Sequence, residues 1–241
     1  MMRRSRPGAV SLLLVGVMAS GCLRDEADRA YHAALEGEET GMTRPEQVAR
    51  ITRAIALAPD RAWYFELRAI YRIDLHEFPE ALSDLDEAIA LGDRPYLRFL
   101  RGLVLCQSRR CDSALGDFEL AIGNQPENTQ FYRGRGLARV EVHRFDEALA
   151  DGEHLVHVAP QMAESYYVRG MALQGLGRDV EAVRDFSSAM RIRPELVYPL
   201  LARARSFETL GDEAHARADR ATAATRNTGV GSAPCVDPFR Y

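Results

Sequence analysis

The sequence contains no lysine, so arginine supplies all 31 of its basic side chains. The 241 residues include one tryptophan and four cysteines, and the 35 acidic residues give a net charge of −4. A mildly acidic chain without a basic stripe is a poor candidate for binding nucleic acid. The hydrophobic fraction of 46% and the charged fraction of 27% are ordinary for a folded protein, which excludes disorder along the body of the chain.

Recognisable catalytic and metal-binding patterns are also missing. No serine, cysteine or threonine has a general base at a familiar spacing, and Gly175 and Gly177 lie in an expected turn between two helices. His154 and His157 lie three residues apart, but a zinc site needs a third rigid ligand and the sequence offers none. A solvated helix face explains both histidines. We therefore expect that the protein is not an enzyme and that it binds no metal, cofactor or small-molecule substrate.

An arginine followed by glycine or alanine recurs at a fixed step along the chain. Successive arginines lie 33 or 34 residues apart, and each is followed thirteen residues later by alanine and sixteen residues later by aspartate. The pairs are Arg68 with Asp84, Arg101 with Asp117, Arg135 with Asp151, Arg169 with Asp185, and Arg203 with Asp219. Self-similarity at this period is typical of stacked repeats, in which each unit packs only on its neighbours.

Each repeat has the apolar pattern of two helices joined by a tight turn. In residues 163–196, the positions that define this pattern are Gly170, Ala182, Phe186, Ala189 and a closing proline, Pro194. These residues resemble the tetratricopeptide repeat family, and the resemblance covers residues 28–226 with five repeats in phase. It implies an all-α fold, an α-solenoid in which antiparallel helix pairs stack into a superhelix.

The organisation of the chain follows from this pattern. Residues 28–61 keep the apolar phase without the arginine and aspartate, so we expect a degenerate capping hairpin there. The expected segments are a signal peptide (1–21), a lipidated tether (22–27), the capping hairpin (28–61), five repeats within 62–226 (62–94, 95–128, 129–162, 163–196 and 197–226) and an irregular tail (227–241).

Two interpretations of the arginine–aspartate pattern are open. If each turn is centred about eight residues after the arginine, the aspartate lies beside the arginine across the hairpin. The arginines could form a row for an acidic ligand, but we favour structural ion pairs, which contribute about 0–1 kcal/mol when exposed. We also expect Gly102 to face Ala114 where the two helices cross. In one repeat Gly152 and Leu155 replace a large and a small residue, which suggests a local exchange of volume.

The first 22 residues are typical of a bacterial lipoprotein signal. A basic start is followed by an apolar stretch of about a dozen residues, which is too short to span a bilayer, and by Ala19-Ser20-Gly21-Cys22. The resemblance implies that Cys22 is lipidated, and Leu23 favours the outer membrane, facing the periplasm. The alternatives are an ordinary signal, an uncleaved anchor, or a cytoplasmic adaptor whose leader we misread.

The remaining cysteines allow one local disulfide. Cys106 ends one expected helix and Cys111 begins the next, so a bond across the turn is plausible in an exported protein. The alternative is two small apolar residues whose Cα atoms stay outside the bonding range. Cys235, in the tail, has no evident partner.

Tetratricopeptide arrays use the inner face of their first helices as a peptide groove. Carried onto this chain, the resemblance implies groove residues Trp63, Ile70, Tyr96, Phe99, Leu103, Arg133, Tyr167, Met171, Tyr198, Leu201 and Arg205. The alternative is that these side chains pack between neighbouring repeats. We expect a membrane-tethered scaffold that binds another protein or peptide of the cell envelope.

Overall fold

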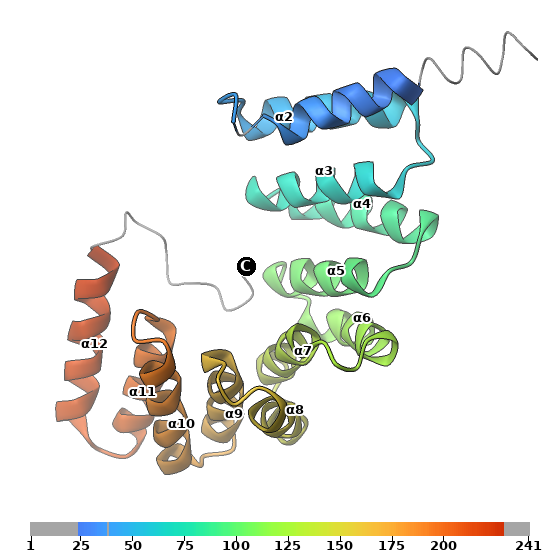
Figure 1. Ribbon diagram of the computed structural model, residues 1–241. Helices are drawn as coiled ribbons and strands as arrows, with labels where there is room; N and C mark the ends of the chain where they lie inside the picture. Colours follow the sequence, from blue (N-terminus) through green and yellow to red (C-terminus); the bar gives the residue numbers. More distant parts are fainter. Residues whose placement is uncertain (1–23, 38, 229–241) are drawn as a thin grey trace, which may run out of the picture. The chain divides into compact units, whose positions relative to one another are not determined.

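Helices are the only regular elements in the computed structural model, which describes residues 24–37 and 39–228 (Figure 1). The leader, Cys22 and Cys235 lie outside these residues. The chain divides into two compact units, Met1–Asp93 and Arg94–Tyr241. Within each unit, helices that follow one another pair as antiparallel hairpins, and the hairpins stack. The predicted all-α fold of stacked helix pairs is confirmed.

The first unit holds two hairpins. A first helix covers residues 24–35 and is followed by α2 (Arg44–Leu57), α3 (Ala62–Asp74) and α4 (Phe78–Leu91). Residues 24–27, which we expected in the tether, are therefore helical. The reason is local packing, since Ala27 is fully buried in the core of this unit together with Ile51 and Tyr64.

The capping hairpin of the first unit replaces the missing ion pair with neutral hydrogen bonds. Gln47 is buried in α2 and donates from Nε2 to the carbonyl oxygen of Ala34 at 2.8 Å. The hydroxyl of Tyr71 donates to the same carbonyl at 3.3 Å. The first bond lies within the capping hairpin and the second joins it to α3, so both satisfy buried polar groups that would be costly to leave unpaired.

The second unit holds four hairpins. Its helices are α5 (Pro95–Gln107), α6 (Cys111–Asn124), α7 (Thr129–Glu141), α8 (Phe145–Val158), α9 (Ala163–Gly175), α10 (Asp179–Ile192), α11 (Tyr198–Thr209) and α12 (Glu213–Thr228). The last helix thus continues through residues 227–228, two residues into the segment predicted as the tail. The largest fully buried side chains of this unit are Phe118, Phe131 and Phe186.

The turn inside each of the five repeats contains one residue with its backbone in the left-handed region. This residue lies eight positions after the arginine of the repeat pattern. These residues are His76, Arg109, His143, Gly177 and Gly211, with φ between 60° and 79°. The left-handed residue reverses the chain tightly, as at other helix C-termini. This turn geometry places the residue sixteen positions after the arginine beside it on the second helix.

In two repeats the glycine after the arginine of the repeat pattern faces an aromatic ring, and not the expected alanine, as its nearest neighbour. A Cβ atom on Gly102 would lie 2.7 Å from a ring carbon of Phe118, and one on Gly170 would lie 2.7 Å from a ring carbon of Phe186. Such distances are too short for real contacts, so the ring sits over the glycine backbone. The ring, and not the alanine, sets how close the two helices approach.

The repeat with Gly152 is built differently. A Cβ atom at Gly152 would lie 2.6 Å from Cα of Arg169, so α8 packs directly against the backbone of α9. The space beside Gly136, which a phenylalanine ring fills in two of the other hairpins, is taken by Val168. A methyl carbon of Val168 lies 2.7 Å from where a Cβ atom on Gly136 would be. The lost volume is therefore replaced by the next repeat, not by Leu155 of the same helix.

Candidate functional site

The structure joins every arginine of the repeat pattern to its aspartate. The shortest N–O distance in each pair lies between 2.6 and 2.7 Å. In all five pairs, Nε and Nη2 of the arginine donate to the two carboxylate oxygens, as for Arg101 and Asp117. We call these five pairs, Arg68–Asp84, Arg101–Asp117, Arg135–Asp151, Arg169–Asp185 and Arg203–Asp219, the ladder.

The ladder aspartates are buried, with side-chain exposures of 2% to 8%, and the arginines are 13% to 28% exposed. The value of about 0–1 kcal/mol for exposed ion pairs therefore does not apply to them. Removing one partner of a buried pair costs about 3–5 kcal/mol because a charge is left uncompensated. The arginines are thus engaged inside the hairpins, which favours the structural interpretation over a row for an acidic ligand.

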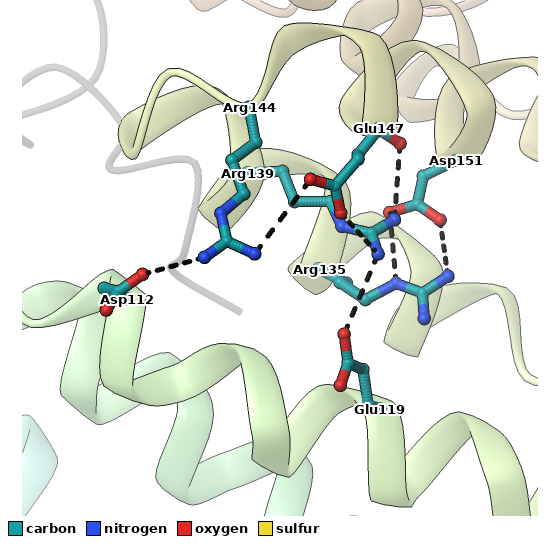
Figure 2. A network of polar contacts seen from close by, with 7 residues as sticks. All are labelled: Asp112, Glu119, Arg135, Arg139, Arg144, Glu147 and Asp151. Carbon is teal, nitrogen blue, oxygen red and sulfur yellow. Dashed lines mark hydrogen bonds and ion pairs between the residues drawn. The ribbon is translucent and has the colours of Figure 1, made fainter.

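In two hairpins, sequence reasoning missed a further arginine that contacts the ladder aspartate. Arg72 and Arg139 lie four residues after a ladder arginine, on the same face of its helix. Nη1 of Arg139 donates to Asp151 at 2.7 Å and to the main-chain carbonyl of Glu147 at 3.3 Å. Figure 2 shows that Arg139 also lies between the carboxylates of Glu147 and Glu119.

Several predicted groove residues are buried between helices of the second unit. Phe99 packs between Phe118 and Phe131, with ring centroids 6.0 and 5.1 Å away. Leu103 and Tyr167 are also buried. For these three residues the structure supports the alternative stated above, in which the side chains hold neighbouring repeats together.

The other predicted groove residues of the second unit stay accessible on its first helices. Tyr96 and Arg205 are exposed, whereas Arg133, Met171, Tyr198 and Leu201 are partly buried. Trp63 and Ile70 belong to the first unit. Trp63 is 41% exposed there, with the guanidinium of Arg61 at 4.9 Å from its ring centroid.

Tyr198 is the centre of a mixed aromatic and charged patch on α7, α9 and α11. Its ring meets the ring of Tyr167 edge-on at a centroid distance of 4.5 Å. Burial raises the pKa of Tyr167 to about 12, and burial and then Glu164 raise the pKa of Tyr198. The positive charge of Arg133 acts on Tyr198 in the opposite sense. We call Arg133, Glu164, Tyr167, Tyr198 and Arg205 the tyrosine patch.

The structure joins Cys106 to Cys111 by a disulfide across the turn between α5 and α6, with Cα atoms 4.2 Å apart. His154 stacks on Tyr132 at a centroid distance of 4.2 Å, which occupies one face of its ring. Within residues 24–37 and 39–228, no group of three potential metal ligands comes together. No helix in this part of the chain has the length and apolar character required to cross a bilayer.

Comparison with known proteins supports the repeat pattern. Residues 66–129 match the family described as "Tetratricopeptide repeat". A search of curated proteins gave no match. Solved structures share the fold at low sequence identity.

A tetratricopeptide repeat protein from Parabacteroides merdae is 16% identical, with a TM-score of 0.75 over 84% of this chain and 80% of its own. PilW, a type IV pilus biogenesis factor, is 17% identical, with a TM-score of 0.72 over 86% and 95%. YrrB, a repeat protein with an unusual peptide-binding site, is 18% identical, with a TM-score of 0.61 over 72% and 90%. Residues 66–129 therefore match the tetratricopeptide repeat family, and the helical hairpins share the fold of these solved structures.

Proposed function

We propose that this protein is a scaffold that binds another protein or a peptide through the first helices of its second unit. The observation that carries the proposal is the tyrosine patch, where a partly buried tyrosine lies among two arginines and a glutamate. Aromatic residues and arginine are enriched at protein interfaces, since one side chain offers both apolar area and a polar group. The same face carries Met171 and Leu201, which add apolar surface beside the patch.

The ladder supports this role by holding the first helices in place. Tyr198 and Arg205 lie on α11, the helix that Arg203 ties to Asp219 on α12. Arg203 also donates to Ser187 of α10 at 2.8 Å, so the same guanidinium joins three helices. A face that is rigid before binding loses little conformational freedom when a partner docks. The action we propose is therefore positional, without a chemical step.

Two of the similar structures agree in kind with this proposal. YrrB is described as having a peptide-binding site, and PilW as a pilus biogenesis factor. Both are properties of those proteins, and at 17% to 18% identity they support a binding role here only by analogy of fold. No partner is carried over from them.

A photo-crosslinking amino acid placed at Arg205 tests the patch in living cells. We expect a crosslinked species of higher mass from this position, because Arg205 is exposed on the proposed face. The matched control is Arg191, which is also exposed but lies on the second helix of its hairpin. Equal crosslinking from both positions, or none from either, would argue against a binding face at the tyrosine patch.

We further propose that the scaffold is anchored in the bacterial cell envelope, at the outer membrane, through lipid on Cys22. The support is the sequence of residues 1–22. Two or more acyl chains hold a protein stably at a membrane, since each buried methylene contributes about 0.8 kcal/mol. Cells fed radioactive palmitate should label the wild-type chain and leave Cys22→Ala unlabelled. An unlabelled wild type would favour the cytoplasmic adaptor instead.

A further inference from the structure

A second arginine recurs at the same place in two hairpins. Arg72 in the first unit donates to Asp84 at 2.7 Å and to the main-chain carbonyl of Glu80 at 3.3 Å. Arg139 in the second unit makes the equivalent bonds at the same two distances. Two independent copies show that these acceptors together form a binding place for a guanidinium group. Both copies also place a glutamate twelve residues after the ladder arginine.

Where the second arginine is absent, this glutamate is usually absent too. Leu105 takes the arginine position in α5, and Ser113 takes the glutamate position in α6. Phe207 takes the arginine position in α11, where it stacks on His215 at the glutamate position, with ring centroids 5.1 Å apart. In these hairpins both positions have changed together, although Asp117 still receives a second arginine, Arg98 of α5, at 3.3 Å.

The hairpin of α9 and α10 is the exception. Leu173 replaces the second arginine, but the acids around it are kept. Counting 34 residues on from the network of Figure 2, the equivalent acids are Glu153 for Glu119, Glu181 for Glu147, and Asp185 for Asp151. The ladder arginine and the turn arginine are kept as well, as Arg169 and Arg178. The guanidinium that Arg139 supplies in Figure 2 is the group that is replaced.

A cavity lies at this place. Its volume is about 290 Å³. It is lined by Leu149, Glu153, Arg169, Leu173, Arg178, Glu181, Arg184 and Asp185. All of these residues belong to the second unit, on α8, α9, α10 and the turn before α10. The acids that surround Arg139 in the preceding hairpin therefore have their equivalents on the wall of an open space.

Asp185 in the cavity has fewer arginine donors than Asp151, its counterpart. Asp151 accepts from two arginines, whereas Asp185 accepts from Arg169 alone among the described residues. Glu181 is held by Arg178 at 2.7 and 2.8 Å, and this hydrogen bond lowers the pKa of Glu181, so its carboxylate is charged at neutral pH. The cavity thus keeps ionised acceptors for a planar cation.

We propose that this cavity binds an arginine side chain of the partner protein, which takes the place that Arg139 fills in the preceding hairpin. The inference rests on the proposed function, since the arginine belongs to the bound protein. A guanidinium fits because its several N–H groups can reach Asp185, Glu153, and both the main-chain carbonyl and the carboxylate of Glu181, as Arg139 does with their equivalents.

The test uses the full-length chain and the blocked tripeptide acetyl-Ala-Arg-Ala-amide, titrated by calorimetry. We expect saturable binding of this peptide and no binding of the same peptide with citrulline, whose side chain has a similar shape but no charge. Glu181→Gln should weaken binding roughly tenfold, because a charge-assisted hydrogen bond becomes a neutral one. Equal affinity for the two peptides, or no binding of either, would overturn the inference.

Leu173→Arg is the decisive variant, because it supplies the guanidinium from inside. We expect it to abolish peptide binding and to keep or raise the unfolding midpoint, whereas the matched Leu105→Arg, without the glutamate, should lower that midpoint. Undiminished peptide binding by a folded Leu173→Arg protein would overturn the proposal.

Arg184 lines the same cavity and distinguishes a cation site from an anion site. Removing this positive charge by Arg184→Ala should keep or strengthen binding of the arginine peptide. A loss of binding would contradict a cation site. Crosslinking from Arg205 that persists in the Leu173→Arg protein leaves the scaffold function intact, so the two proposals can fail separately.

Discussion

Replacing Asp151 by asparagine isolates the contribution of ladder charge to stability. Its carboxylate is 3% exposed and accepts three hydrogen bonds, from Arg135 at 2.6 and 3.1 Å and from Arg139 at 2.7 Å. Asparagine keeps the shape of the side chain but removes the charge. Its amide group also points N–H donors at one of the guanidinium groups, which can only donate.

The size of the effect follows from burial. Breaking a buried ion pair by removing one partner costs about 3–5 kcal/mol. Arg135 and Arg139 are 16% and 11% exposed, so solvent replaces little of the lost interaction. We therefore expect Asp151→Asn to destabilise the second unit by about 4 kcal/mol. Asp185→Asn should cost less, since its carboxylate accepts from only one arginine among the described residues.

Urea denaturation followed by circular dichroism measures this loss. The matched control is Glu195→Gln, which neutralises an acid of the exposed pair Arg193–Glu195, where the side chains are 48% and 63% exposed. This control should unfold at the same urea concentration as the wild type, because exposed pairs contribute little. If Asp151→Asn also unfolds with the wild type, the ladder is not a source of stability and the link between its burial and its energy is refuted.

Three further predictions follow from single contacts. Gly152→Ala should destabilise the second unit by about 1–3 kcal/mol, because the new Cβ atom would lie 2.6 Å from the α9 backbone. Gly116→Ala, whose Cβ atom would have open space around it, should stabilise the same unit slightly. Thermal melts compare the two variants. Reducing the bond between Cys106 and Cys111 should lower stability by about 2 kcal/mol, measured by urea unfolding with and without reductant. Burial raises the pKa of Tyr167 to about 12, so the folded state keeps this proton above pH 10, where the unfolded state begins to lose it. Stability should thus fall as pH rises from 10 to 12, and less steeply in Tyr167→Phe.

The fold was predictable because its signal is repeated. A single arginine and aspartate sixteen residues apart would mean little, but five copies in phase fix the hairpin, its turn and the residues that face each other across it. The turn residues show the same logic: His76, Arg109 and His143 carry positive φ at positions where two other repeats have glycine. Composition alone would not have placed a left-handed turn at a histidine.

Burial was harder to predict, because it depends on neighbouring repeats and not on the hairpin itself. Phe99 was assigned to an open groove from its place on a first helix, yet the rings of Phe118 and Phe131 enclose it. Arg139 did carry a usable signal, since it lies four residues after Arg135 on one helix face. The proposals on residues 1–22 stay predictions.

The repeats divide their arginines into two sets with different constraints. The ladder pair is present in all five repeats, because an aspartate buried inside a hairpin is costly without its counterion. The second arginine is present in two, and each hairpin tolerates its loss when a leucine or phenylalanine fills the space. Changes at the second position should therefore cost the array less stability than changes in the ladder. A contact specific to one partner can therefore arise at the position of Leu173 with little loss of stability. The acids kept around this position indicate that the contact requires a positive charge.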